Sequence, residues 1–240
     1  MTNLFIDIET IPAQSMEIKE RIQKKVRPPK TITKADSIAE WYNSPKYAKA
    51  CDSAWEATGL NSMFGEICAI GWTWDDIKYK DDDGEQIVFS LGRDKEREDG
   101  EALLLSDFFQ AIIDQRNSHY DKWINWVGHN LVSFDMPFLF HRSIINRVDF
   151  GDLYMPKNLR PTGNKGVFDT MTEWSGWGKR VGLDDLALAL GVPGKSGNGS
   201  QVLEMWENGQ IDDICRYVED DVRVTRNVYI RMYPWFNGGR

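Results

Sequence analysis

The sequence predicts a layered α/β fold with one sheet. Short apolar runs alternate along the chain with amphipathic segments of helical spacing, and 41% of the 240 residues are hydrophobic. This length and composition suit one sizeable domain, or one domain with an insertion. We therefore expect a single domain over residues 1–240.

The predicted strands are short and mostly apolar. Residues 4–8 have the character of a buried central strand, and Pro12 ends it. The other strands are expected at residues 66–74, 86–90, 123–127 and 166–169.

The predicted helices follow from apolar side chains that recur three and four residues apart. They are expected at residues 101–114, 138–145, 183–190 and 211–232. Pro137 suits the first turn of the second of these helices. Asp169 or Thr170 is expected to cap a further helix.

The composition favours a cytoplasmic protein without a membrane partner. No apolar run approaches the roughly 18 residues that a membrane span needs. Asp7 interrupts the apolar start so early that a signal peptide is not expected. Cys51, Cys68 and Cys215 are scattered, which suits a reducing compartment and forms no zinc-binding spacing.

Four acidic residues in three segments are the candidates for chemistry. Asp7 and Glu9 lie two apart in a predicted strand, so their side chains share a face. Tyr217 and Asp221 share a helix face at i and i+4. Asp135 follows the Gly-His-Asn turn after the strand at 123–127. Carboxylates in such apolar settings are costly unless cations lie between them, which predicts bound divalent metal.

Oxygen ligands of this kind select Mg²⁺ or Mn²⁺ rather than zinc. Two such ions about 4 Å apart can hold both the attacking and the leaving oxygen of a phosphodiester. A tyrosine hydroxyl beside them can orient the attacking water. The pattern therefore indicates metal-dependent phosphodiester hydrolysis.

These segments resemble the three motifs of the DEDD superfamily of 3′–5′ exonucleases. The motifs are Asp7-Ile8-Glu9, Asn130-xxx-Phe134-Asp135 and Tyr217-xxx-Asp221. The sister subgroup has histidine five residues before the last aspartate, where this chain has Arg216, so the chain resembles the tyrosine subgroup. Within it, the stretches at 191–195 and 217–222 are similar to the exonuclease domain of family B DNA polymerases.

The resemblance implies a ribonuclease H-like fold, with a central mixed five-stranded sheet flanked by helices on both faces. It implies that two divalent cations, Mg²⁺ or Mn²⁺, act in removing 5′-mononucleotides from the 3′ end of single-stranded or frayed DNA. The implied metal ligands are Asp7, Glu9, Asp135 and Asp221, with Tyr217 positioning the nucleophile; the implied contacts to the terminal nucleotide are Thr10, Asn130 and Phe134.

Three alternatives stay open on the sequence alone. An RNA-trimming exonuclease of the ribonuclease D type uses the same acids and tyrosine, and the 2′-hydroxyl that separates the two sugars is read by loops that the motifs do not include. A catalytically silent nucleic-acid-binding module would keep the fold without the chemistry. A small phosphodiesterase would act on dinucleotides.

Charge is distributed unevenly along the chain. The net charge of −8 argues against a protein that binds a long stretch of duplex. It is compatible with an enzyme that contacts only a few nucleotides beside bound metal ions, because the ions supply positive charge there. We predict a helical, basic insertion at about residues 13–64, with Pro28 and Pro29 between two helical stretches. This insertion is interpreted either as a solvated surface or as an electrostatic guide for a nucleic acid end, testable by salt sensitivity.

Overall fold

The computed structural model describes residues 2–76, 79–81, 84–118, 123–156, 159, 163–176, 178–194 and 201–236. The chain divides into two compact units, one formed by Met1–Glu9 with Ile67–Arg240 and the other by Thr10–Glu66. The second unit contains all of the residues predicted as an insertion, 13–64.

The first unit contains a five-stranded mixed sheet with the order β3-β2-β1-β4-β5. The strands are β1 (Thr2–Ile11), β2 (Glu66–Trp74), β3 (Phe89–Gly92), β4 (Ile124–Gly128) and β5 (Val167–Asp169). β4 is parallel to both β1 and β5, while β2 and β3 are antiparallel. The bonds from Asp75 N to Asn3 O and from Cys68 Sγ to Glu9 O show that β2 also runs antiparallel to β1.

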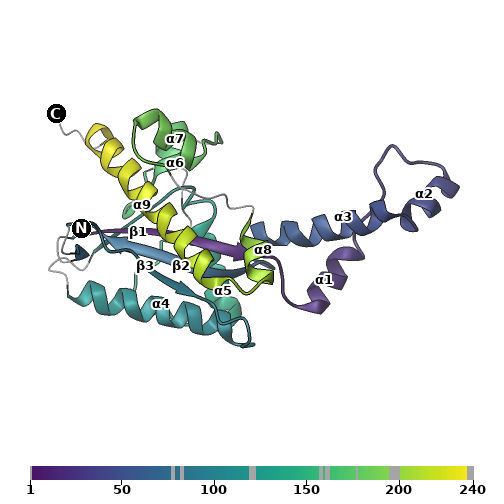
Figure 1. Cartoon of the computed structure of the whole chain (residues 1–240), viewed down its shortest axis with the longest axis horizontal. Coiled ribbons are helices and arrows are strands. Elements are labelled where there is room, and N and C mark those ends of the chain that lie inside the picture. Colours follow the sequence, from purple (N-terminus) through teal and green to yellow (C-terminus); the bar gives the residue numbers. More distant parts are fainter. Residues whose placement is uncertain are drawn as a thin grey trace. The chain divides into compact units, whose positions relative to one another are not determined.

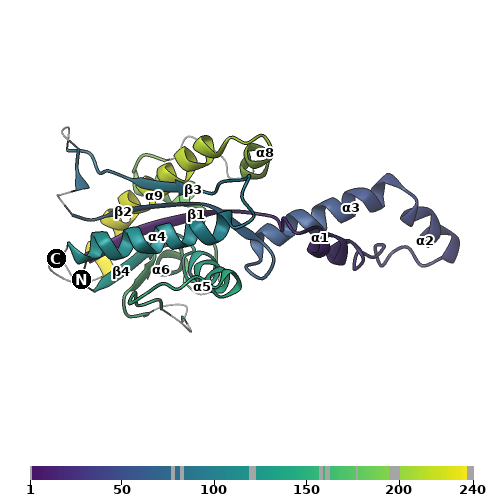
Figure 2. The same cartoon turned by 90° about the horizontal axis from the view of Figure 1, so that it is seen from below.

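Helices cover both faces of this sheet (Figure 1). They are α4 (Gly100–Asn117), α5 (Asp135–Asn146), α6 (Thr170–Ser175), α7 (Leu183–Leu190), α8 (Val202–Glu207) and α9 (Ile211–Phe236). Figures 1 and 2 show α4 on one side of the sheet and α9 on the other. This arrangement confirms the predicted fold class.

The alternation of β1 assigns its side chains to two separate cores. Leu4, Ile6 and Ile8 pack into a cluster with residues of α4 and α5. Phe5 instead packs with Val222 and other residues of α7 and α9. Odd-numbered side chains of β1 therefore point toward α9, as the two-residue period of a strand requires.

Several boundaries differ from the sequence prediction. The strand expected at 86–90 begins only at Phe89, because the Gln86 side chain donates to the carbonyl oxygens of Trp74 and Tyr79 and the residue forms only an isolated bridge with Lys80. α5 begins at Asp135, three residues before the predicted start. Pro137 is tolerated there because the first turn of a helix has N–H groups without intrahelical acceptors.

At the C-terminal end, α9 continues to Phe236, past the predicted end at 232. Lys195, in one of the stretches on which the resemblance rests, lies outside the described residues. In the part of the chain that is described, no helix combines the length and the apolarity needed to cross a membrane.

The second unit contains three helices and a short 3₁₀ turn. They are α1 (Met16–Gln23), α2 (Ala35–Tyr42), α3 (Pro45–Glu56) and the turn Ala57–Leu60. α1 packs on α3, where Lys19 Nζ lies 3.9 Å from the centroid of the Trp55 ring. The Trp41 ring makes edge contacts with Tyr42 and Tyr47 at 5.2 and 5.3 Å between centroids, which joins α2 to α3.

Candidate active site

β1 presents two carboxylates on the sheet face that α9 covers. Asp7 and Glu9 follow Phe5 at intervals of two residues, so all three side chains point to that face. Phe5 is buried, whereas Asp7 and Glu9 are partly exposed. Along this one face of β1, the side chains therefore change from a buried apolar residue to two partly exposed carboxylates.

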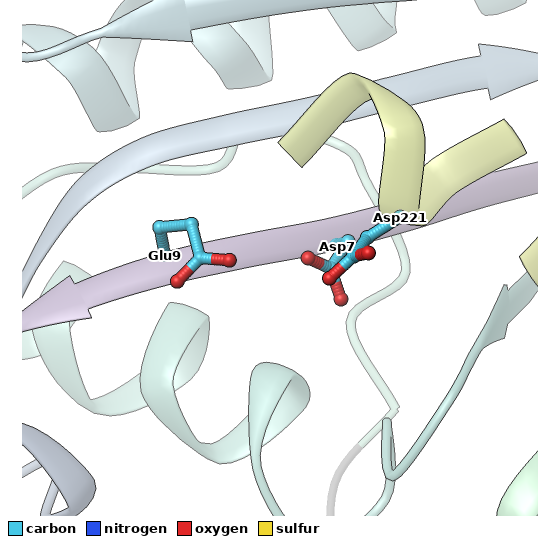
Figure 3. Close-up of side chains that lie close together, drawn as sticks. All are labelled: Asp7, Glu9 and Asp221. Carbon is cyan, nitrogen blue, oxygen red and sulfur yellow. The ribbon is translucent and has the colours of Figure 1, made fainter. Parts of the chain in front are cut away.

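α9 supplies the third carboxylate. The helix approaches β2 closely at Gly71, where an added Cβ would lie 3.1 Å from both the Cγ1 and the carbonyl oxygen of Val218. Asp221, 7% exposed, lies one helical turn after Val218 and is thereby placed over β1. One carboxylate oxygen each from Asp7, Glu9 and Asp221 lies within 4.8 Å of the others. Figure 3 shows these side chains above β1, with α9 beside them.

This cluster fits a divalent cation by its chemistry. Three carboxylates so close together repel one another, and a hard cation relieves that repulsion while accepting oxygen ligands. Among the described residues this is the group of acidic, histidine or cysteine side chains with such spacing. The donors are all oxygen, which suits Mg²⁺ or Mn²⁺ and not zinc.

Asp135 lies beside the cluster but in a different environment. It is the first residue of α5, 2% exposed, and its Oδ1 accepts a hydrogen bond of 3.2 Å from Ile8 N. Burial raises the pKa of Asp135 to about 8, and the charges of Asp169 and Asp221 add to the rise. In the metal-free protein this carboxyl is therefore protonated at neutral pH.

The pKa of Asp135 predicts how the metal-free protein responds to pH. Between its ordinary pKa of 3.8 and about 8, the folded state holds a proton that the unfolded chain has lost, so the free energy of unfolding falls as pH rises. The Asp135→Asn side chain cannot ionise, so the free energy of unfolding of this variant lacks that pH-dependent fall. In EDTA, we expect the Tm of the variant relative to the parent to rise steadily from pH 4 to about pH 8. A Tm difference that stays constant over this range would contradict the burial argument.

Asp169 holds the loop that carries the second motif. Its side chain accepts from Met171 N and Thr172 N, which confirms the predicted N-cap of α6. The same carboxylate also accepts from Asn130 N at 3.0 Å and Val132 N at 2.9 Å. Sequence reasoning missed this second function, because it depends on β5 lying next to β4.

The predicted nucleotide contacts have different surroundings. Asn130 has a left-handed backbone (φ 64°), and its buried Oδ1 has no hydrogen-bond donor among the described residues. The Phe134 ring packs 4.8 Å from that of Phe138. The Thr10 hydroxyl belongs to the other unit, where it donates to Gly59 O at 2.7 Å.

Tyr217 and His129 complete the residues that the motifs single out. Tyr217 is 8% exposed and lies one turn before Asp221 on the buried side of α9. His129 bonds through Nδ1 to Thr170 Oγ1 and through Nε2 to Val181 O, both at 2.9 Å. Both ring nitrogens of His129 therefore have partners within the protein, one a side-chain hydroxyl and one a backbone carbonyl.

Comparison with known families identifies the chain. Residues 60–238 match a family described as a predicted 3′–5′ exonuclease related to the exonuclease domain of PolB. The chain belongs to this family. An exonuclease of this kind acts on nucleic acid and generally depends on divalent metal. The matched residues include Asp135, Tyr217 and Asp221 and leave Asp7 and Glu9 outside.

A solved structure supports the fold. The chain is similar to the family B DNA polymerase from the hyperthermophilic archaeon Pyrobaculum calidifontis, with a TM-score of 0.57 and 15% identity. The similarity covers 98% of this chain but only 25% of the polymerase, so this chain spans about a quarter of that protein's length. No curated protein matches the sequence. Together with the family match, this structure confirms the resemblance drawn from the motifs.

Proposed function

We propose that the chain is a metal-dependent 3′–5′ exonuclease that removes 5′-mononucleotides from single-stranded or frayed DNA. The observation that carries the proposal is the cluster of Asp7, Glu9 and Asp221. Two elements far apart in the sequence, β1 and α9, bring these carboxylates together in a chain of an exonuclease family.

The carboxylates have separate proposed roles. Asp7, Glu9 and Asp221 would hold one Mg²⁺ or Mn²⁺, and Asp7 with Asp135 a second. Such ions activate water and stabilise negative charge on the leaving oxygen. The bond from Ile8 N to Asp135 fixes that carboxyl against β1, so the two parts of the ligand set share one scaffold.

The remaining residues are proposed to hold the substrate. Asn130, in a left-handed backbone conformation at the start of the second motif, is proposed to contact the terminal nucleotide. Phe134 offers a partly exposed aromatic ring, and Thr10 follows Glu9 directly along the chain. The terminal base must leave its stack to reach the carboxylates, which favours single-stranded or frayed ends.

Tyr217 is proposed to orient the attacking water through its hydroxyl. We expect Tyr217→Phe to lower kcat on the order of a hundredfold, the lower end for positioned proton-transfer groups, with little change in KM. The measurement is steady-state hydrolysis of a labelled oligonucleotide.

Tyr229 on the same helix provides the matched control. It is 2% exposed, and its hydroxyl bonds to Asn3 Oδ1 at 3.2 Å, away from the carboxylates. Tyr229→Phe should affect stability and leave kcat at the parent value. Equal kcat values for the two variants would make Tyr217 a packing residue.

The test of the function itself is a time course on a 5′-labelled single-stranded DNA oligonucleotide. It is run with Mg²⁺, with Mn²⁺ and with EDTA, alongside the RNA of the same sequence. A metal-dependent ladder that shortens from the 3′ end, faster on DNA, is expected. A faster ladder on RNA would favour the ribonuclease D type, and no ladder on either polymer would overturn the proposal.

A further inference from the structure

The positive charge of this chain is concentrated in one segment. Residues 19–49 contain nine lysines and arginines against three acidic residues. The rest of the chain contains 20 basic and 34 acidic residues, because the totals are 29 and 37. A polyanion that approaches this protein is therefore attracted mainly by residues 19–49, which we call the basic segment.

Some cations of the basic segment have a structural contact. Lys19 packs over the Trp55 ring, and Lys24 pairs with Glu20 at 3.6 Å. Arg27 donates to the carbonyl oxygens of Lys24 and Val26 just after α1 ends. These three side chains already have a partner within their own unit.

The other cations of the segment are exposed and have no ion pair among the described residues. They are Arg21, Lys25, Lys30, Lys34, Lys46 and Lys49. An isolated surface charge gains nothing for folding, since even paired surface charges contribute little. The Debye length is about 8 Å at physiological salt, so each of these cations acts mainly on charges close to it. Six of them within 29 residues can therefore attract an anionic chain that lies along this segment.

The basic segment is held in a folded unit. Trp41 and Cys51 are buried, and the three rings of Trp41, Tyr42 and Tyr47 contact one another. The Trp55 indole also donates to Ala13 O at 2.8 Å, which fixes α3 to the start of the unit. The cations are thus displayed on helices and on the connection between α1 and α2.

We propose that the basic segment binds the phosphate backbone of the nucleic acid strand whose 3′ end is hydrolysed. This proposal rests on the proposed exonuclease function. It supplies the cations for backbone binding that the acidic remainder of the chain lacks. Backbone binding is sequence-independent and requires only spaced cations on a stable scaffold, which is what the unit displays. The segment lies wholly outside the family match at 60–238, so the family supplies no role for it.

The test is the salt dependence of oligonucleotide binding by the full chain. The variant carries Arg21→Gln, Lys25→Gln, Lys30→Gln and Lys34→Gln, all at exposed positions, so the unit should fold. Binding of a fluorescent single-stranded 20-mer is measured by anisotropy in EDTA, where no hydrolysis occurs. Each lost phosphate contact should lower the slope of log Kd against log salt by about 0.7, so we expect a slope smaller by up to about 3.

Two controls separate charge from folding and from catalysis. A variant with Glu17→Gln, Asp36→Asn, Glu40→Gln and Asp52→Asn, all at exposed positions of the same unit, should bind the oligonucleotide more tightly than the parent. Hydrolysis of a dinucleotide, which is too short to engage more than the terminal-nucleotide site, should be the same in the parent and in both variants.

Loss of the backbone contact and loss of the exonuclease function give different results. An unchanged slope and Kd in the lysine and arginine variant would overturn the proposal and point to a protein partner or to simple solubility. Weaker binding in that variant, with no hydrolysis by any form of the protein, would retain the backbone contact and reject the exonuclease.

Discussion

Asp221→Asn is expected to slow hydrolysis at least a thousandfold, equivalent to about 4 kcal/mol of transition-state stabilisation. The substitution keeps the shape of the side chain and removes one charge from the cluster with Asp7 and Glu9, the proposed metal site. Because an amide binds Mg²⁺ more weakly than a carboxylate, the ion proposed to activate water would be lost or displaced. Single-turnover rates on a labelled oligonucleotide, at saturating Mg²⁺, measure the effect.

The neighbouring Asp220 is the matched control. It lies on the same helix and carries the same charge, but its carboxylate accepts a hydrogen bond of 3.1 Å from Arg223 at the protein surface. Asp220→Asn should retain the parent rate. Comparable rates for the two variants, whether both fast or both slow, would contradict the assignment of Asp221 as a ligand.

A second measurement separates metal binding from catalysis. An ion that binds only the folded state raises the Tm with its concentration. The parent should therefore gain Tm on addition of Mg²⁺ or Mn²⁺, and Asp221→Asn should gain much less. In EDTA the variant should be at least as stable as the parent, because one of three mutually repelling carboxylates is gone. Equal gains in Tm for both proteins would place the metal elsewhere.

Strand periodicity was sufficient to place the first motif. Any strand over residues 4–9 directs Asp7 and Glu9 to one face, and helical spacing does the same for Tyr217 and Asp221. The local sequence pattern does not predict that this face of β1 and this face of α9 lie against each other. This arrangement depends on α9 crossing the sheet beside Gly71, which only the motif resemblance anticipated. The catalytic roles of these residues stay predictions.

The environment of Asp135 is a property of the assembled sheet. β4 pairs with β1 only over Thr2–Phe5, so Ile8 N, beyond the paired stretch, bonds to Asp135 instead. The burial that raises the pKa of Asp135 follows from this position. Local sequence signals instead narrowed the N-cap of α6 to Asp169 or Thr170, because capping involves residues two and three positions ahead, and the structure assigns it to Asp169.

A buried ion pair that the sequence did not reveal holds α5 in place. Arg142 Nη2 lies 2.6 Å from Glu101 Oε2, and its Nε donates to Oε1 at 2.9 Å. Ile67 N and the Asn146 side chain donate to the same carboxylate at 2.7 and 2.8 Å. Glu101 therefore joins α4, α5 and the start of β2, and α5 begins with Asp135. In the sequence it resembles an ordinary acidic residue of a first helical turn.

Glu101→Ala should destabilise the fold more than any single substitution in the carboxylate cluster. It leaves the guanidinium of Arg142, 6% exposed, without a counter-charge and removes the acceptor of Ile67 N. Breaking a buried pair in this way costs about 3–5 kcal/mol. For a chain of this size that corresponds to a fall in Tm of roughly 6–20 °C, measured by calorimetry or circular dichroism.

Two further variants test the mechanism of that loss. The double variant Glu101→Leu with Arg142→Met removes both charges and should recover much of the Tm, because an apolar pair of similar volume avoids the buried charge. Asp99→Ala, at the exposed pair with Arg97, should change the Tm little. If the double variant were no more stable than Glu101→Ala, the loss would come from packing and the Ile67 N–H bond rather than from the uncompensated charge.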